Sequence, residues 1–275
     1  MFRRFVQSIL DLLTSGSRLA VLTGAGCSTE SGIPDYRGPG GRWKTHTPIL
    51  YQEFLRSEYA RRRYWARSFR GWKKFDAAAP NRTHRALAQL EQTGRLVPLI
   101  TQNVDRLHQA AGHREVIELH GHNDEVLCIS CRRTMPRATF QSRMEETNRN
   151  FVADILSILP DGDAELPDEA YSEFAPVSCD ECGGIIKPNV VFFGENVPRE
   201  RVDRAMESVA TSDALLVIGS SLHVWSGYRF AVRAHELGKP LVIINQGETR
   251  ADHLATIKLE ANCGEVMEEL AATRC

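Results

Sequence analysis

Four cysteines in two Cys-x-x-Cys pairs are the residues whose spacing points most directly to chemistry. The pairs are Cys128 with Cys131 and Cys179 with Cys182. Four thiolates complete a tetrahedral structural zinc site and leave no open position for catalysis. The alternative, four unrelated buried cysteines, explains two such pairs poorly. We therefore predict one structural Zn²⁺ per chain.

The segment between the two cysteine pairs is longer than in a compact zinc ribbon. Residues 132–178 separate the pairs, whereas a ribbon uses about 15 to 20 residues. A polar stretch over residues 161–169 has the character of an excursion outside the core. We expect a small inserted module that leaves the metal and returns to it.

A glycine pair follows the first apolar run, as in loops that approach a phosphate. Gly24 and Gly26 flank Ala25 directly after Leu19–Thr23, so their amides can contact a pyrophosphate. The third glycine of the dinucleotide fingerprint would fall at Thr29, and no acidic residue ends a clear second strand. The pattern alone leaves dinucleotide binding open. A dehydrogenase needs the full fingerprint to hold its cofactor extended. The incomplete pattern therefore suits an enzyme that cleaves the cofactor better than one that transfers hydride.

Polar side chains follow three further apolar runs. These residues are Gln102, Asn103 and Asp105, then Gly219, Ser220 and Ser221, then Asn245, Gln246 and Gly247. Parallel strands present their carboxyl ends at one edge of a sheet, where ligands bind. For Asn103 or Asp105 the alternative is a cap on the following helix. The convergence of four such strand ends favours a nucleotide site.

His120 is the candidate general base, because it follows the short apolar run over residues 116–119 and precedes a glycine. Imidazole has a pKa near neutrality, which suits proton transfer. A lone histidine is more often structural, and His84, His108, His113 and His122 compete for the role. Position at a strand end is what distinguishes His120.

The elements that must position these residues alternate between apolar runs and helical periodicity. The runs are Leu19–Thr23, Leu96–Thr101, Val190–Phe193, Ala214–Ile218 and Leu241–Asn245. The helix candidates are Thr83–Gln92, Arg199–Thr211 and Ser226–Leu237. Such runs suit strands buried on both faces. We predict an α/β fold with a Rossmann-like, doubly wound parallel sheet and a small inserted zinc-binding module.

Composition narrows the class of protein. The chain has 275 residues, 42% of them hydrophobic and 25% charged, with 34 Lys plus Arg against 35 Asp plus Glu. These values exclude a disordered chain or a coiled coil, and they provide no global positive field for nucleic acid or membranes. No apolar run reaches the roughly 18 residues of a membrane span. We expect a soluble protein of a reducing compartment, with a short first helix over residues 1–13 rather than a targeting peptide. Residues 32–48 are expected to form a mobile loop over a site.

Together, these motifs resemble the sirtuin family. The matching strings are Gly24-Ala25-Gly26-Cys27-Ser28, Ser31-Gly32-Ile33-Pro34-Asp35-Tyr36-Arg37, Gln102-Asn103-Val104-Asp105, His120-Gly121, Phe193-Gly194-Glu195, Gly219-Ser220-Ser221, Asn245 and the two cysteine pairs. The resemblance covers nearly the whole chain. It is nearest to the class II branch, which contains mitochondrial sirtuin 4 and bacterial relatives.

The resemblance implies an NAD-dependent protein lysine deacetylase or deacylase, a transferase that forms nicotinamide, O-acyl-ADP-ribose and free lysine. It implies His120 and Asn103 as catalytic residues and acylated lysine side chains of proteins as substrates. The NAD site would consist of Gly24, Ala25, Gly26, Ser28, Asp35, Tyr36, Arg37, Gln102, Asn103, Asp105, Gly219, Ser220, Ser221, Asn245, Gln246, Gly247 and Cys263. The substrate backbone would pair, as an added strand, with Val191, Phe192, Phe193, Gly194 and Glu195.

The resemblance also implies one catalytic domain over residues 1–275. Its Rossmann-like part would comprise about 1–50, 76–122 and 186–275, and its small part about 123–185 with a helical segment at about 51–75. The compartment would be the cytoplasm in a bacterium, or the mitochondrial matrix for a eukaryotic relative. Neither a membrane nor nucleic acid is expected as a partner.

Two positions bear on the acyl group and on the fate of NAD. Tyr64 and Arg67, on one helical face, resemble the pair with which some class II sirtuins hold an acidic acyl chain, although Arg67 also fits one of many solvated charges. Tyr36 stands where many sirtuins have phenylalanine, and its hydroxyl would admit water beside the reactive ribose. Mono-ADP-ribosyl transfer to protein from the same site is the alternative activity, because it shares the NAD cleavage step and differs only in the nucleophile that captures the sugar. A further alternative is a non-catalytic zinc and nucleotide-binding module, suggested by the basic, aromatic stretch 56–74.

Overall fold

A six-stranded parallel sheet forms the larger of two compact units in the computed structural model, which describes residues 7, 9, 11, 17–36, 48–159 and 162–272. In spatial order the strands are β11 (Ile257–Leu259), β10 (Leu241–Ile244), β9 (Ala214–Ile218), β1 (Leu19–Thr23), β2 (Leu99–Thr101) and β3 (Val116–Glu118). The chain runs outward from β1 to β3 on one side and from β9 to β11 on the other. The strand order therefore reverses between β1 and β9, where α/β sheets bind ligands.

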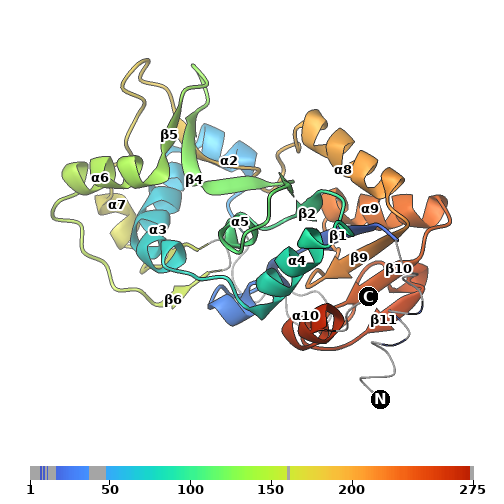
Figure 1. Ribbon diagram of the computed structural model, residues 1–275. Coiled ribbons are helices and arrows are strands. Elements are labelled where there is room, and N and C mark those ends of the chain that lie inside the picture. Colours follow the sequence, from blue (N-terminus) through green and yellow to red (C-terminus); the bar gives the residue numbers. More distant parts are fainter. Residues whose placement is uncertain are drawn as a thin grey trace. The chain divides into compact units, whose positions relative to one another are not determined.

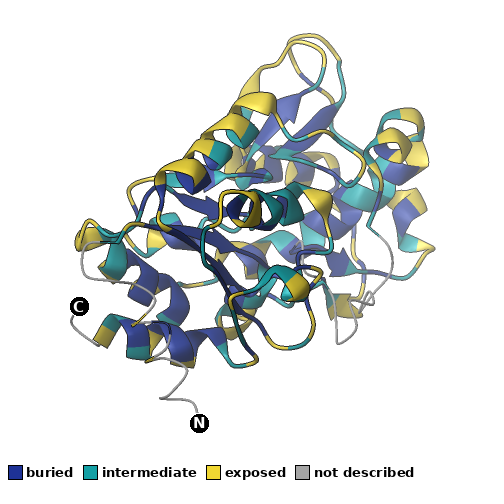
Figure 2. Ribbon diagram, turned by 90° about the vertical axis from the view of Figure 1, so that its right-hand side faces the viewer, coloured by how far each residue is buried: buried dark blue, intermediate teal, exposed yellow. Residues whose placement is uncertain are grey.

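Helices cover both faces of this sheet (Figure 1). They include α4 (Arg82–Gln92), α8 (Arg199–Thr211), α9 (Trp225–Glu236) and α10 (Cys263–Ala272). Leu19 and Val21 of β1 pack in one cluster with α4 and α10. Ala20 and Leu22 pack in another cluster with α8 and α9. The central strands β1, β9 and β10 are thus buried on both faces, whereas the edge strands β3 and β11 are only partly buried; Figure 2 shows the central strands dark blue.

The predicted doubly wound fold is confirmed, with one strand reassigned. The bounds predicted for β1, β9 and α8 are those observed. The run Val190–Phe193 is not a strand of the parallel sheet. Instead β8 (Ile186–Val190) pairs antiparallel with β4 (Gly121–Cys128) in the smaller unit, so the prediction was wrong there. The short strand β11 was not predicted.

The smaller unit spans Thr45–Ala78 and His120–Asn196. Its sheets are β5 (Thr134–Pro136), β4 and β8 in that order, and a hairpin of β6 (Ser157–Ile158) with β7 (Ala164–Glu165). Its helices include α2 (Tyr51–Arg56), α3 (Glu58–Asp76), α6 (Arg137–Thr147) and α7 (Ala170–Glu173). An aromatic core that includes Trp65, Phe140 and Tyr171 joins α3, α6 and α7.

The segment between the cysteine pairs packs onto α3 instead of leaving the core. Ala164 and Leu166 are buried, at 0% and 2% exposure. Gly71 of α3 lies so close to this segment that a Cβ there would be 2.0 Å from the carbonyl oxygen of Gly162. The prediction of a polar excursion over 161–169 is therefore wrong for the described residues 162–169, because apolar side chains between the acids anchor the segment.

Short elements complete the described chain. They are η1 (Ala25–Cys27), η2 (Thr29–Ser31), α5 (Leu107–Ala110) and η4 (Asp252–Leu254). Most of the expected first helix at 1–13, and residues 37–47 of the expected loop 32–48, lie outside the described residues. Within the described ranges, no helix combines the length and the apolar character needed to cross a membrane.

Candidate functional site

The loops after β1 and β9 touch at the carboxyl edge of the parallel sheet. The Gly24 amide donates to the carbonyl of Ile218 at 3.0 Å, and the Gly26 amide to that of Gly219 at 2.9 Å. A Cβ at Gly24 would lie 2.8 Å from the Gly219 oxygen, and one at Gly26 would lie 2.9 Å from the Gly219 Cα. Gly219 itself has a φ of 61°, in the left-handed region. These glycines allow the two backbone loops to meet. Because the amides of Gly24 and Gly26 already donate to backbone carbonyls, the prediction that these two amides contact a pyrophosphate is wrong.

Asn103 and Asp105 form a hydrogen-bonded group with the loop after β1. The Asn103 amide donates to the Gly24 carbonyl at 3.1 Å and to the Ser28 hydroxyl at 3.0 Å. The Ser28 hydroxyl donates to Asp105 Oδ2 at 2.6 Å. Asp105 Oδ1 also accepts from the amide of Leu107, the first residue of α5, at 3.0 Å, so Asp105 contacts the start of α5 as well as holding Ser28, although Arg106 is the N-cap. The two interpretations from the sequence are compatible.

Gln102 connects the ends of β1, β2 and β9. Its side-chain amide donates to the Ser220 hydroxyl at 2.9 Å and to the Thr23 carbonyl at 3.2 Å. The carbonyl of Ser221 accepts from the Arg250 amide at 2.9 Å. The polar side chains predicted at these strand ends therefore do lie together.

The end of β10 extends this group toward α10. The side-chain amide of Asn245 donates to the carbonyls of Gln246 at 3.0 Å and Gly247 at 3.2 Å. Cys263 opens α10 with its sulfur 3.8 Å from the Ile244 carbonyl. Burial and the charge of Glu30 raise the pKa of Cys263 to about 12, so this thiol is neutral and suits an apolar contact better than a nucleophilic role.

The remaining predicted cofactor residues lie on the loop after β1. Ala25 belongs to η1, and Asp35 and Tyr36 are partly exposed further along. Arg37 lies outside the described residues.

His120 lies two residues after the end of β3 and is the first residue of the second segment of the smaller unit. It is partly exposed, and its carbonyl accepts from the Val191 amide at 2.7 Å. By contrast, His84, His108 and His113 are 0%, 1% and 6% exposed. Those three are poorly placed to exchange protons with a substrate.

The predicted substrate segment, Val191 to Glu195, forms a turn rather than a continuous strand. Gly194 adopts a φ of 80°, and the Glu195 carboxylate accepts from the Phe192 amide at 2.9 Å. The Phe193 carbonyl accepts from the Tyr51 amide at 2.9 Å. The turn is thus fixed from within the smaller unit, while the backbone of Gly194 remains exposed.

Tyr64 and Arg67 have different surroundings on α3. The Tyr64 ring lies 5.2 Å from the ring of Phe192, a residue of the predicted substrate segment. Arg67 is only 5% exposed, so it is not one of many solvated charges. Its Nε is buried and finds no hydrogen-bond partner within the described part of the chain.

The four cysteines gather into one cluster, as the sequence predicts. Their sulfurs all lie within 4.8 Å of one another, with Cys128 and Cys182 at 3.5 Å and Cys131 and Cys179 at 3.8 Å. Tetrahedral coordination with Zn–S bonds of about 2.3 Å requires sulfurs about 3.8 Å apart. Burial would raise the pKa of Cys128, but hydrogen bonds from the backbone and thiol of Cys131 and from Cys182 lower it to about 6. The cluster therefore fits a structural Zn²⁺.

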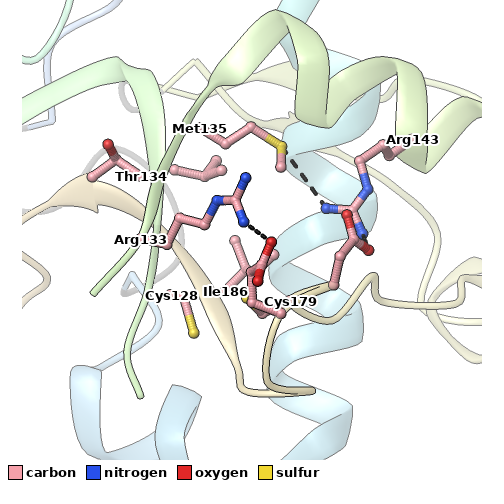
Figure 3. Close-up of a pocket in the computed structure, with 10 residues that line it drawn as sticks. Cys128, Arg133, Thr134, Met135, Arg143, Cys179 and Ile186 are labelled. Carbon is pink, nitrogen blue, oxygen red and sulfur yellow. Dashed lines mark hydrogen bonds and ion pairs between the residues drawn. The ribbon is translucent and has the colours of Figure 1, made fainter. Parts of the chain in front are cut away.

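Ion pairs surround a small pocket beside this cluster (Figure 3). Arg133 pairs with Glu181 and Arg143 with Asp180. Both acids stand between the second pair of cysteines, while both arginines follow the first pair. The Arg133–Glu181 pair therefore joins the two cysteine-bearing turns, and the Arg143–Asp180 pair joins the second turn to α6.

Two residues that the sequence analysis did not single out support the candidate site. Asn81 is 7% exposed and donates to the Cys27 carbonyl at 2.8 Å. Lys187, 5% exposed, pairs with Glu195 at 2.9 Å. The position of Asn81 after a proline and before a helical pattern indicates a helix cap. No local pattern marks Lys187.

Comparisons with known proteins show which family the chain resembles. The NAD-dependent protein deacetylase of Xanthomonas axonopodis pv. citri (strain 306) is 52% identical over 266 residues, which cover 97% of this chain and 91% of that protein. The NAD-dependent protein deacetylase of Bordetella bronchiseptica is 51% identical over 267 residues, 97% of each chain. A solved structure of Sir2 with a p53 peptide and NAD+ is 32% identical, with a TM-score of 0.77 over 97% of each chain. A model of the Sir2 family matches residues 24–226, and the chain belongs to that family.

Proposed function

We propose that this protein is an NAD-dependent protein deacetylase that removes acyl groups from lysine side chains. The observation that carries the proposal is the hydrogen-bonded group of Asn103, Ser28 and Asp105 at the carboxyl edge of the sheet. The relatives named above, which are bacterial, support it. Membership of the class II branch and a cytoplasmic location are part of the same proposal.

Each part of the candidate site would have a distinct role in the reaction. NAD would supply the ribose whose hydroxyl oxygen carries the acyl group in the product, and the loops after β1, β9 and β10 would bind it. Asn103 and Asp105 would orient the ribose and the carboxamide, because their side chains are already fixed by Ser28. His120 would accept a proton from a ribose hydroxyl. The turn at Val191–Glu195 would bind the substrate backbone.

The test is a mass-spectrometric assay of NAD consumption and acyl loss from acetyl-lysine peptides. We expect His120→Ala to lower kcat by about 10² to 10⁴, the range for loss of a general base. The matched control is His253→Ala, which removes an exposed histidine of η4 and should leave the rate unchanged. Full activity of His120→Ala would contradict the assignment of the base.

Mono-ADP-ribosyl transfer is the alternative activity of the same site. Intact-mass analysis of a substrate protein separates the two, because acyl removal lowers its mass and ADP-ribose addition raises it. The non-catalytic module is less well supported. Two of the basic residues of α3 that suggested it are engaged internally: Arg61 donates to the Phe54 carbonyl at 3.0 Å and Arg62 to the Ser172 carbonyl at 3.1 Å.

We further propose that acidic acyl groups, such as glutaryl, are preferred. Tyr64 packs against Phe192 of the substrate segment, and Arg67 lies one helical turn along α3. A buried guanidinium with an unpaired Nε offers a hydrogen bond that a carboxylate would satisfy. An acetyl group has no terminal carboxylate with which to make this bond.

The acyl preference is tested by comparing kcat/KM for acetyl and glutaryl peptides. We expect Arg67→Ala to lower the glutaryl value about tenfold or more, the worth of a hydrogen bond to a charged group, and to spare the acetyl value. Arg70→Ala is the matched control, since Arg70 lies one turn further along α3 and its Nε is also buried and unpaired within the described chain. An equal loss for both substrates in Arg67→Ala would remove the proposed preference.

A further inference from the structure

The start of α4 makes hydrogen bonds to the loop over residues 24–36. This loop carries several of the predicted NAD contacts. Asn81 is the N-cap of α4, and its Oδ1 accepts from the Thr83 amide at 2.9 Å. Its Nδ2 donates to the Cys27 carbonyl at 2.8 Å and to the Ser31 hydroxyl at 3.0 Å. One side chain thus caps the helix and fixes both short helical turns of the loop.

Arg82, the next residue, makes a two-bond contact to the same loop. Its Nη2 lies 2.7 Å from Glu30 Oε1, and its Nε lies 2.9 Å from Glu30 Oε2. The hydrogen bond from Arg82 is the main cause that lowers the pKa of Glu30, so the carboxylate stays charged. Both side chains are partly sheltered, at 31% and 28% exposure. A planar guanidinium that meets both carboxylate oxygens fixes orientation as well as distance.

The same guanidinium reaches α10, which lies beside α4 (Figure 1). Arg82 donates to Asn262 Oδ1 and to Glu268 Oε2, both at 3.3 Å. Asn262 Oδ1 accepts the Gly264 amide at 2.7 Å and so caps the start of α10. Cys263, a predicted NAD contact, lies between Asn262 and Gly264 in the sequence. Arg82 therefore links two separate parts of the predicted cofactor site.

The absence of a side chain at position 264 leaves room for this contact. A Cβ on Gly264 would lie 2.3 Å from Arg82 Nε and 2.7 Å from Glu30 Oε2. Gly264 does not have a positive φ, so its backbone conformation does not require glycine. The space it leaves is occupied by the Arg82–Glu30 pair.

From this geometry we infer that Arg82, paired with Glu30 and assisted by Asn81, is a positioning residue for NAD: it holds the loop over residues 24–36 against the start of α10. The inference rests on the proposed NAD-dependent function. Loss of the pair frees the loop without removing any group that the proposal places on the reacting atoms. Loss of the pair should therefore weaken NAD binding and leave the rate of the chemical step nearly unchanged.

The experiment measures KM for NAD, kcat and the Kd for NAD in the full chain. We expect Arg82→Gln and Glu30→Gln each to raise KM and Kd about fivefold, somewhat below the worth of a fully buried charged hydrogen bond, with kcat nearly unchanged. The double variant should be no worse than either single one, because both remove the same contact. Arg82→Lys should recover only part of the binding, since an ammonium cannot contact both oxygens in the same way.

Gly264→Ala separates positioning from stability. Alanine forms helices better than glycine, so the melting temperature should not fall, yet its Cβ displaces the pair and KM for NAD should rise. Arg199→Gln is the control, because it breaks an exposed ion pair on α8 at 94% and 66% exposure and should change neither constant. Unchanged KM in Arg82→Gln and Gly264→Ala, or a loss confined to kcat, would overturn the inference. A wild-type protein that does not bind NAD would instead overturn the proposed function.

Discussion

At the scale of single residues, Lys187 and Glu195 form a sheltered ion pair beneath the turn proposed to bind substrate. Lys187 Nζ donates to both carboxylate oxygens, at 3.0 and 2.9 Å, and to the Val190 carbonyl at 2.8 Å. The ammonium also lies 5.5 and 5.4 Å from the ring centroids of Tyr51 and Phe192. Removal of one charge would leave the other sheltered without its partner, which costs far more than an exposed pair is worth.

We expect Lys187→Met to lower the free energy of unfolding by about 3 kcal/mol, because it leaves the Glu195 charge unpaired. Addition of Glu195→Gln should recover much of this loss, since the glutamine oxygen can still accept from the Phe192 amide. Urea unfolding of the two variants measures the difference. Arg233→Met removes one partner of an exposed pair and should cost under about 1 kcal/mol. A double variant less stable than the single one would contradict this account.

The sequence predicted the residues at strand ends because each follows an apolar run that ends at a polar or glycine residue. Gln102, Asn103 and Ser220 were found in this way, and the structure brings them together. The Arg82–Glu30 contact was not predicted. Its partners come from α4 and from the loop after β1, and no local pattern relates an arginine to a carboxylate in another element.

At the scale of elements, the cysteine cluster joins the ends of two neighbouring strands. Cys128 is the last residue of β4, and the second pair precedes β8. The Ile129 amide donates to the Ile185 carbonyl at 2.9 Å, which continues the strand pairing into the cysteine-bearing turns. A metal at this point closes the end of the small sheet. Its contribution to stability should therefore extend through that unit.

We expect one equivalent of zinc in the wild-type protein and less in Cys179→Ser. The melting temperature of Cys179→Ser should fall on the order of 10 °C, because the metal-binding energy of a structural site is folding energy. Thermal unfolding and metal analysis measure both quantities, and a strong chelator should reproduce the shift. Ser178→Ala changes the exposed neighbour and serves as the control. Retained zinc and stability in Cys179→Ser would refute coordination by four thiolates.

The reassigned strand shows what limits prediction of the elements. The apolar run Val190–Phe193 looks like a buried parallel strand, yet β8 ends at Val190 and pairs antiparallel with β4. An apolar run indicates burial on both faces but does not identify the sheet that buries it. The strand β11 has only three residues, Ile257–Leu259, and was missed because so short a run has no measurable period.

At the scale of the whole molecule, three buried histidines connect the candidate site to the stability of the fold. The rings of His84 and His113 each pack edge-to-face on His108, at 4.8 and 5.3 Å. Burial, followed by the charges of His113 and Arg85, lowers the pKa of His84 to about 4. The pKa values of His108 and His113 are also lowered, chiefly by burial, although Glu91 opposes the shift at His113. His108 Nε2 lies 2.9 Å from the Thr23 hydroxyl at the end of β1.

The sign of the pH dependence follows from these lowered pKa values. An unfolded histidine takes up a proton below about pH 6.5, whereas folded His84 does so only near pH 4. The contribution of neutral His84 to stability is therefore fully present above pH 6.5 and is lost as the pH falls toward 4. Proton uptake linked to His84 alone should lower the free energy of unfolding by about 2 kcal/mol as the pH falls from 7 to 5.

We expect His84→Gln to flatten the fall in stability between pH 7 and pH 5, because glutamine does not titrate. His84 is the N3 residue of the capping box that begins with Asn81. Glutamine is a natural residue at that position, so the cap should remain. Urea unfolding at several pH values measures the slope, and His253→Gln controls for removal of an exposed histidine. An unchanged slope in His84→Gln would mean that the buried cluster does not set the acid stability of the protein.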